Sequence, residues 1–265
     1  NLVRASTTKM AQSRRRVLEK TDWMEAPEGD EKSARFGFDI LKQSGNDVLN
    51  IQSLSVGYHN QAVSNNVALK LYRTESLALV GPNGVGKSTL LKTIMKELPA
   101  LAGEIHYGTG IQFGYYDQEQ ANLKGNKLVL NELWDDYPHV NEKDIRGILG
   151  RFLFTGDDVL KPVSTLSGGE KARVALAKLM MQKANVLLLD EPSAGLSPKL
   201  VDMIFEKIID VNKTGVSMII VEQNAREALK MADHGYVLAM GRNVLDDTGE
   251  ALLANEEVRR LYLGG

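Results

Sequence analysis

Short apolar runs alternate with amphipathic stretches from about residue 48 onward, a pattern typical of buried strands separated by helices. The segments "VLNIQSLSV" and "NVALKLY" alternate like half-buried strands, and "GEIHYG" and "IQFGYY" also predict strands. Continuous apolar runs of strand length follow in "SLALV", "NVLLLD", "VSMIIV" and "GYVLAM". Helical periodicity is found in residues 87–97, 199–211 and 224–231, in most of 127–182 and in a final stretch. The pattern predicts an α/β fold with a mostly parallel central sheet, helices on both faces and an antiparallel side sheet.

The first 24 residues differ, because a single apolar residue recurs every seven positions from Val3 to Met24 within a basic sequence. This predicts a basic helix with a narrow apolar stripe. The segment "APEGDEKSA" then breaks the helical pattern and is typical of a linker. We therefore divide the chain into residues 1–46, a basic helix and linker, and residues 47–265, a globular domain with a helical subdomain at about 119–182. The basic helix is either a solvated surface or a contact for nucleic-acid phosphates.

The composition limits the class of protein. A chain of 265 residues with 43% hydrophobic content can form one large or two small domains, and a net charge of −2 does not indicate a polyanion-binding chain. It contains no cysteine, which excludes disulfides and thiolate metal sites and fits a reducing compartment. No apolar run approaches the roughly 18 residues of a membrane span, and no signal peptide is evident. We therefore expect a soluble, cytoplasmic protein without a transmembrane segment of its own.

The segment "GPNGVGKST" matches the phosphate-loop pattern G-x-x-x-x-G-K-[ST] between a predicted strand and a predicted helix. Its glycines let the backbone approach phosphates closely, and the helix N-terminus adds positive potential. Lys87 is expected to reach the β- and γ-phosphates, and the Ser88 hydroxyl to ligate Mg²⁺. The alternative is a glycine-rich turn without a ligand. The residues expected around the nucleotide phosphates are Gly81, Asn83, Gly84, Gly86, Lys87, Ser88 and Thr89.

Two adjacent acids, Asp190 and Glu191, end the apolar run "VLLLD". Because ligands of a doubly wound sheet bind at the carboxyl ends of its strands, Asp190 is placed to hold the Mg²⁺ that Ser88 also ligates. Glu191 lies one residue further and is the candidate general base for a water that attacks the γ-phosphate. The alternative is that Glu191 is an ordinary surface acid at a strand end.

The segment "LSGGEKARVALAK", residues 166–178, would alone be a helix start with a capping serine. Together with the phosphate loop and "LLLDEP", it resembles the nucleotide-binding domain of ATP-binding-cassette (ABC) proteins over about residues 48–265. The resemblance implies Mg²⁺-dependent ATP hydrolysis in a head-to-tail homodimer. In that arrangement Ser167, Gly168 and Gly169 of one copy contact the γ-phosphate of the ATP held by the other.

The resemblance also assigns roles to three further residues. Gln118 in "YYDQ" corresponds to the glutamine that touches Mg²⁺ and the attacking water, and Tyr58 in "VGYHN" to an aromatic residue that stacks on adenine. Tyr58 has the alternative of being a plain strand-end aromatic. Gln223 in "IIVEQNA" stands where most relatives have a switch histidine. The implied catalytic residues are Glu191, Gln223 and Gln118, and the implied metal ligands are Ser88, Gln118 and Asp190.

The two parts of the chain resemble different branches of this family. Up to about Asp190 the sequence is similar to the linker end and second cassette of ABC-F translation factors. From "SAGLSPK" onward it is similar to the ATPases of branched-chain amino-acid importers. Three alternatives stay open for the biological partner: a ribosome or rRNA reached by the basic N-terminal helix, a membrane permease, or neither. The third corresponds to an engineered chimera joined near residues 190–195.

Overall fold

The computed structural model describes residues 40–117, 123 and 125–262. The backbone divides into two units, residues 1–35 and 36–265, and every element below belongs to the second. The predicted basic helix and its linker up to residue 39 lie outside the described residues, so the helix and the proposed division at residues 46 and 47 stay predictions. No helix within the described ranges is long and apolar enough to cross a bilayer.

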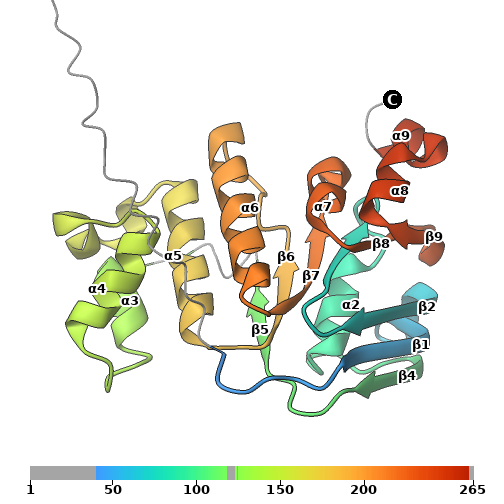
Figure 1. Cartoon of the computed structure of the whole chain (residues 1–265), viewed down its shortest axis with the longest axis horizontal. Coiled ribbons are helices and arrows are strands. Elements are labelled where there is room, and N and C mark those ends of the chain that lie inside the picture. Colours follow the sequence, from blue (N-terminus) through green and yellow to red (C-terminus); the bar gives the residue numbers. More distant parts are fainter. Residues whose placement is uncertain (1–39, 118–122, 124, 263–265) are drawn as a thin grey trace, which may run out of the picture. The chain divides into compact units, whose positions relative to one another are not determined.

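The centre of the fold is a six-stranded sheet with the order β5-β6-β7-β3-β8-β9. The first five strands are parallel, and β9 is antiparallel to β8. Strands β5, β6 and β7 can be followed side by side in Figure 1. This confirms the mostly parallel α/β sheet expected from the continuous apolar runs. The strands are β3 (Ser76–Val80), β5 (Phe113–Tyr116), β6 (Val186–Asp190), β7 (Ser217–Glu222), β8 (His234–Ala239) and β9 (Arg242–Thr248).

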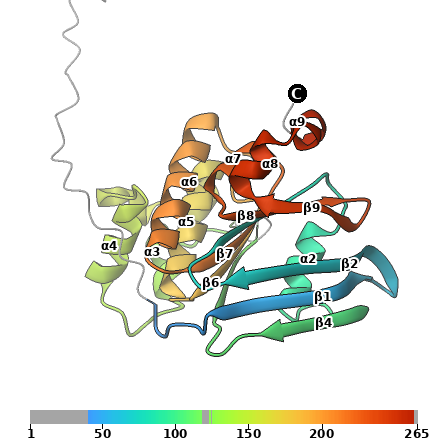
Figure 2. The ribbon, with the colours of Figure 1, turned by 45° about the vertical axis from the view of Figure 1, so that its right-hand side comes forward.

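Both faces of this sheet are covered, because alternate side chains of each strand point to opposite sides. In β6, Leu187 and Leu189 pack in the core beneath α5 and α6, whereas Val186 and Leu188 pack in the core that contains α2 and a second sheet. Helices α7, α8 and α9 cover β3 and β8 (Figures 1 and 2). The helices are α2 (Lys87–Ile94), α3 (Val129–Trp134), α4 (Glu142–Arg151), α5 (Gly168–Met181), α6 (Pro198–Lys213), α7 (Ala225–Met231), α8 (Gly249–Ala254) and α9 (Glu256–Tyr262). Two short 3₁₀ helices, η1 (Gly156–Leu160) and η2 (Val163–Thr165), precede α5.

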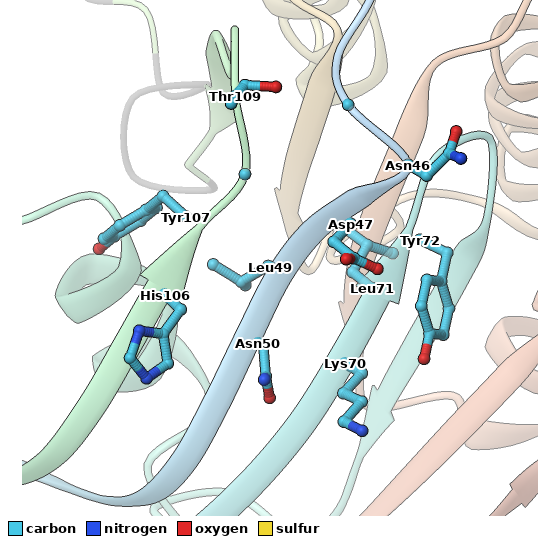
Figure 3. Close-up of a pocket in the computed structure, with 12 residues that line it drawn as sticks. Asn46, Asp47, Leu49, Asn50, Lys70, Leu71, Tyr72, His106, Tyr107 and Thr109 are labelled. Atoms are coloured by element: carbon cyan, nitrogen blue, oxygen red, sulfur yellow. The ribbon is translucent and has the colours of Figure 1, made fainter.

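The second sheet is antiparallel, with the order β2-β1-β4, as its alternating pattern predicts. Leu49 and Leu71 are paired across it and face the core, whereas Asn50 is paired with both Lys70 and His106 on the outer face. A hollow of about 520 Å³ lies along this sheet, and Figure 3 shows the residues that line it; none of them is a predicted nucleotide-binding residue. The strands are β1 (Asp47–Tyr58), β2 (Gln61–Tyr72) and β4 (Ala102–Tyr107).

Two details differ from the sequence expectations. The predicted final helical stretch is present as α8 and α9, but strand β9, which the sequence interpretation missed, precedes it. Met240 and Gly241 both have positive φ angles, 49° and 70°, the geometry of a type I′ turn that folds β9 back on β8. Helix α2 ends at Ile94 rather than 97, because Lys96 has a left-handed backbone with a φ of 64°.

Candidate nucleotide-binding site

The phosphate loop connects the carboxyl end of β3 to the first turn of α2. Gly86 precedes this turn with a φ of 95°, and a Cβ atom there would lie 2.5 Å from the Ser64 hydroxyl oxygen. Ser64 lies in β2 and donates a hydrogen bond to the Val85 carbonyl. The loop is therefore tied to the antiparallel sheet, and only glycine fits both the backbone angle and the space at position 86.

Lys87 begins α2 and is buried, with 5% of its surface exposed. Its Nζ donates hydrogen bonds to the carbonyls of Gly81, at 2.8 Å, and Pro82, at 3.0 Å. Burial lowers the pKa of Lys87, and the nearby carboxylates of Glu191 and Asp190 oppose that shift. The ammonium group is thus held within the loop, next to backbone N–H groups that can bind an anion.

Ser88 and Asp190 meet although they are 102 positions apart. The Ser88 hydroxyl donates to Asp190 Oδ1 at 3.0 Å, and the Tyr115 hydroxyl donates to Oδ2 at 3.3 Å. Burial raises the pKa of Asp190, with the hydrogen bond from Ser88 acting against it. Burial and the neighbouring Asp190 carboxylate also raise the pKa of Tyr115.

The oxygen atoms of Ser88 and Asp190 fit a magnesium ion, which needs few protein ligands, better than a metal ion that is held entirely by protein side chains. Within the described ranges, no cluster of three or more His, Asp or Glu side chains could hold a metal ion. Mg²⁺ needs no such cluster, since it is commonly bound by one or two protein oxygens, water and substrate phosphates. The Asp190 carboxylate and Ser88 hydroxyl supply that kind of partial site beside the phosphate loop.

Glu191 and Gln223 follow the ends of the neighbouring strands β6 and β7. The Gln223 side-chain amide donates to Glu191 Oε2 at 2.8 Å, and the Glu191 backbone amide donates to the Val221 carbonyl at 2.9 Å. Glu191 has a positive φ of 49°, which is uncommon for a residue other than glycine and is found more often at functional sites. The two side chains therefore meet at the same edge of the sheet as Asp190.

Ser167 caps α5, and Gly168 and Gly169 are the next two residues. The Ser167 hydroxyl accepts from the Glu170 amide, while the Glu170 carboxylate accepts from the Ser167 amide at 2.8 Å and hydroxyl at 2.7 Å. Helix α5 packs on the sheet face opposite the one that contacts α2 (Figures 1 and 2). Within one copy, this segment therefore does not join the phosphate loop.

Tyr58 and Gln118 are two further predicted residues, expected to contact adenine and the metal ion, respectively. Tyr58 ends β1 and is 43% exposed, and Gln118 lies outside the described residues. The sequence interpretation missed Tyr115 and the buried Glu222, which accepts hydrogen bonds at the end of β7. Both are at or near the carboxyl end of a parallel strand beside β6, a position that could have indicated their place at this edge.

The fold and the site together define a phosphate-loop nucleotide-binding protein. The family model described as "ABC transporter" matches residues 64–194. YdiF of Bacillus subtilis, which carries the name of an ATP-binding protein, is 60% identical over 211 residues, 79% of this chain and 33% of YdiF. The branched-chain amino acid transport ATP-binding protein BraG of Pseudomonas aeruginosa is 35% identical over 237 residues, 82% of this chain and 100% of BraG. The chain thus spans about a third of YdiF and the whole of BraG.

Solved structures agree. The protein cbiO1 of Clostridium perfringens, part of the ABC transporter complex cbiONQ, aligns with a TM-score of 0.66 and 25% identity, covering 82% of this chain and 94% of cbiO1. The ATP-binding cassette MJ0796, solved as a dimer with ADP and Pi, aligns with a TM-score of 0.66 and 21% identity, covering 76% and 98% of the two chains. The chain belongs to the ABC transporter family and has the fold of its ATP-binding domains.

Proposed function

We propose that this chain binds Mg²⁺-ATP and hydrolyses it to ADP and phosphate. The observation that carries the proposal is the 3.0 Å contact between Ser88, in the phosphate loop, and Asp190, at the end of β6. It joins a group that can ligate a metal to a carboxylate that can hold the same metal, next to the Lys87 ammonium. Family membership supports the same activity.

Each residue of the site has one role in this proposal. Lys87 would neutralise the β- and γ-phosphates, and Ser88 and Asp190 would hold Mg²⁺, which would offset charge on the phosphate oxygens. The Glu191 carboxylate accepts a proton from the attacking water. At the same time the water oxygen bonds to the γ-phosphorus, and the bond between the γ-phosphorus and the leaving ADP oxygen breaks. Gln223 orients Glu191 through the 2.8 Å hydrogen bond, but it cannot carry the positive charge available to histidine. Gln118 would complete the metal site, and Tyr58 would stack on adenine.

We propose a head-to-tail homodimer as the active form. In one copy, the Ser167 segment and the phosphate loop lie on helices that pack on opposite faces of the sheet. A second copy related by a two-fold axis can supply its Ser167, Gly168 and Gly169 to the open side of the bound ATP. This gives each of two ATP molecules a site built from both copies.

An ATP titration with and without Mg²⁺, read by equilibrium binding and phosphate release, tests the proposal. Lys87→Ala should abolish tight ATP binding, because it removes the cation from the loop. Lys92→Ala is the matched control, since it removes the same charge from the same helix α2 outside the loop. Unchanged ATP affinity in Lys87→Ala, or Mg²⁺-independent phosphate release, would contradict the proposed site.

We also infer that the chain joins segments from two branches of the family, near residues 190–195. The change in sequence style after Glu191 is the observation behind this proposal. In the structure, β3 from the first segment lies between β7 and β8 from the second. Such a join keeps the fold because both branches build the same sheet, although the partner surfaces then come from different sources.

Because strands from both segments alternate in the central sheet, we expect the described globular part of the chain to unfold cooperatively despite its mixed origin. A mixed chain should keep nucleotide binding without its native partner. Ribosome co-sedimentation and capture by an importer's membrane subunit distinguish the alternatives. Stable, nucleotide-dependent binding to either one would contradict the uncoupled chimera and identify the partner.

A further inference from the structure

Glu222 is a buried acid at the end of β7, with only 1% of its surface exposed. Its Oε1 accepts a hydrogen bond from the Ser193 backbone amide at 2.8 Å, and its Oε2 accepts one from the Gln223 backbone amide at 3.2 Å. The Ser193 hydroxyl is a further donor to the same carboxylate. Burial raises the pKa of Glu222, and these hydrogen bonds act against that shift. Burying a carboxylate here costs free energy of folding, so we expect Glu222 to have a functional role in addition to packing.

The partners of Glu222 belong to the two loops that carry the hydrolytic side chains. Ser193 lies two residues after Glu191, and the intervening residue is Pro192, whose ring restricts the backbone. Gln223 follows Glu222 directly and donates its side-chain amide to Glu191. The Glu222 carboxylate thus completes a closed set of contacts that runs from Glu191 through Ser193 to Gln223 and back to Glu191.

We propose that Glu222 is a positioning residue for ATP hydrolysis, because its carboxylate holds the Ser193 and Gln223 backbones so that Glu191 and Gln223 meet. The inference rests on the proposed function. It requires both carboxylate oxygens, since one accepts from each loop. A single acceptor could hold only one loop, and the Glu191 backbone, with its positive φ, would lose part of its support.

Glu222→Gln is the direct test. Glutamine has the same shape but one acceptor oxygen, so its amide group must face one backbone N–H donor. The neutral side chain also removes a buried charge, so folding should tolerate it. We expect kcat to fall on the order of tenfold to a hundredfold, because small misplacements of reacting groups have effects of that size. The KM and Kd for ATP should stay within about twofold, since the phosphate loop is unchanged.

Ser217→Ala is the matched control at the opposite end of the same strand. Ser217 is fully buried, and its hydroxyl oxygen accepts from the Thr74 backbone amide at 2.8 Å. This variant also deprives a loop amide of its side-chain acceptor, but far from the carboxyl edge of the sheet. Its melting temperature should fall, whereas its kcat should stay within about twofold of the parent.

The outcomes separate the inference from the function on which it rests. If the parent chain neither binds nor hydrolyses ATP, both fail. If the parent is active and Glu222→Gln keeps the parent kcat, the positioning role alone is overturned. The same holds if Glu222→Gln and Ser217→Ala both lose kcat in proportion to their loss of melting temperature. Should Glu222→Gln not fold, Ser193→Ala removes a donor to the same carboxylate. A several-fold loss of kcat at constant KM would then support the role, and parent-like kcat would overturn it.

Discussion

Replacing Ser167 by alanine tests two roles that we assign to one side chain. In the free chain its hydroxyl caps α5, accepting from the Glu170 amide at 3.3 Å and donating to the Glu170 carboxylate at 2.7 Å. In the proposed dimer the same hydroxyl contacts the γ-phosphate held by the partner copy. The first role contributes to stability without nucleotide, and the second contributes to turnover.

The two effects differ in size. Loss of an N-terminal serine cap costs about 1 kcal/mol, and the long 3.3 Å contact favours the lower part of the usual range. For a domain of this size, that lowers the melting temperature by about 2–4 °C. A hydrogen bond to a charged phosphate contributes about 1.5–3 kcal/mol, so its loss should reduce kcat/KM roughly tenfold to a hundredfold.

Thr248→Ala is the matched control, because Thr248 caps α8 by accepting from the Ala251 amide at 3.2 Å. Both variants should show a similar fall in melting temperature without nucleotide, measured by circular dichroism. Only Ser167→Ala should lose ATP turnover, measured by phosphate release at saturating Mg²⁺. Equal turnover in the two variants would refute the second role of Ser167 and leave it as a helix cap alone.

Three further predictions, the first with a control variant, address the rest of the site. Tyr115→Phe should lower Mg²⁺-dependent turnover about fivefold, because it removes a hydrogen bond to Asp190, whereas Tyr116→Phe should not; equal Mg²⁺ titrations for both variants would contradict this. Gln223→His should raise turnover, because histidine can carry charge at the switch position; a clear fall in a steady-state assay would show that glutamine suits this site. The capping hydroxyl and amide hold the pKa of Glu170 below its usual 4.5, so its stabilising effect is present above that pH and is lost as pH falls through the lowered pKa. Glu170→Gln should remove this acid-side loss from a plot of melting temperature against pH; an unchanged plot would contradict the assignment.

The sequence predicts most of the central sheet, because strands buried on both faces need continuous apolar runs. All five residues of β6, from Val186 to Asp190, are buried, and they form one of the continuous apolar runs of the sequence. Strand β9 lacks this signal, since it lies at an edge and mixes Val244 and Leu245 with exposed polar residues. Its position depends on a turn at Met240 that apolar periodicity does not indicate.

In the candidate site, too, some residues can be found from the sequence and others cannot. Lys87 and Ser88 can be found in the sequence because the phosphate loop is a continuous segment, and its backbone geometry depends on local glycines. Tyr115 and Glu222 could not be assigned partners, since each contacts a residue brought close only by strand pairing. A short motif predicts a local conformation, whereas contacts between loops depend on the register of the sheet.

The proposed sandwich of two chains around two ATP molecules is tested most directly by light scattering on Glu191→Gln. This variant should block hydrolysis and remove a negative charge near the γ-phosphate while leaving the phosphate loop intact. ATP supplies contacts to the partner's Ser167 segment that ADP cannot, so ATP should shift the population toward a dimer. We predict a monomer without nucleotide and a dimer with ATP. A monomer at saturating ATP and high protein concentration would contradict the sandwich.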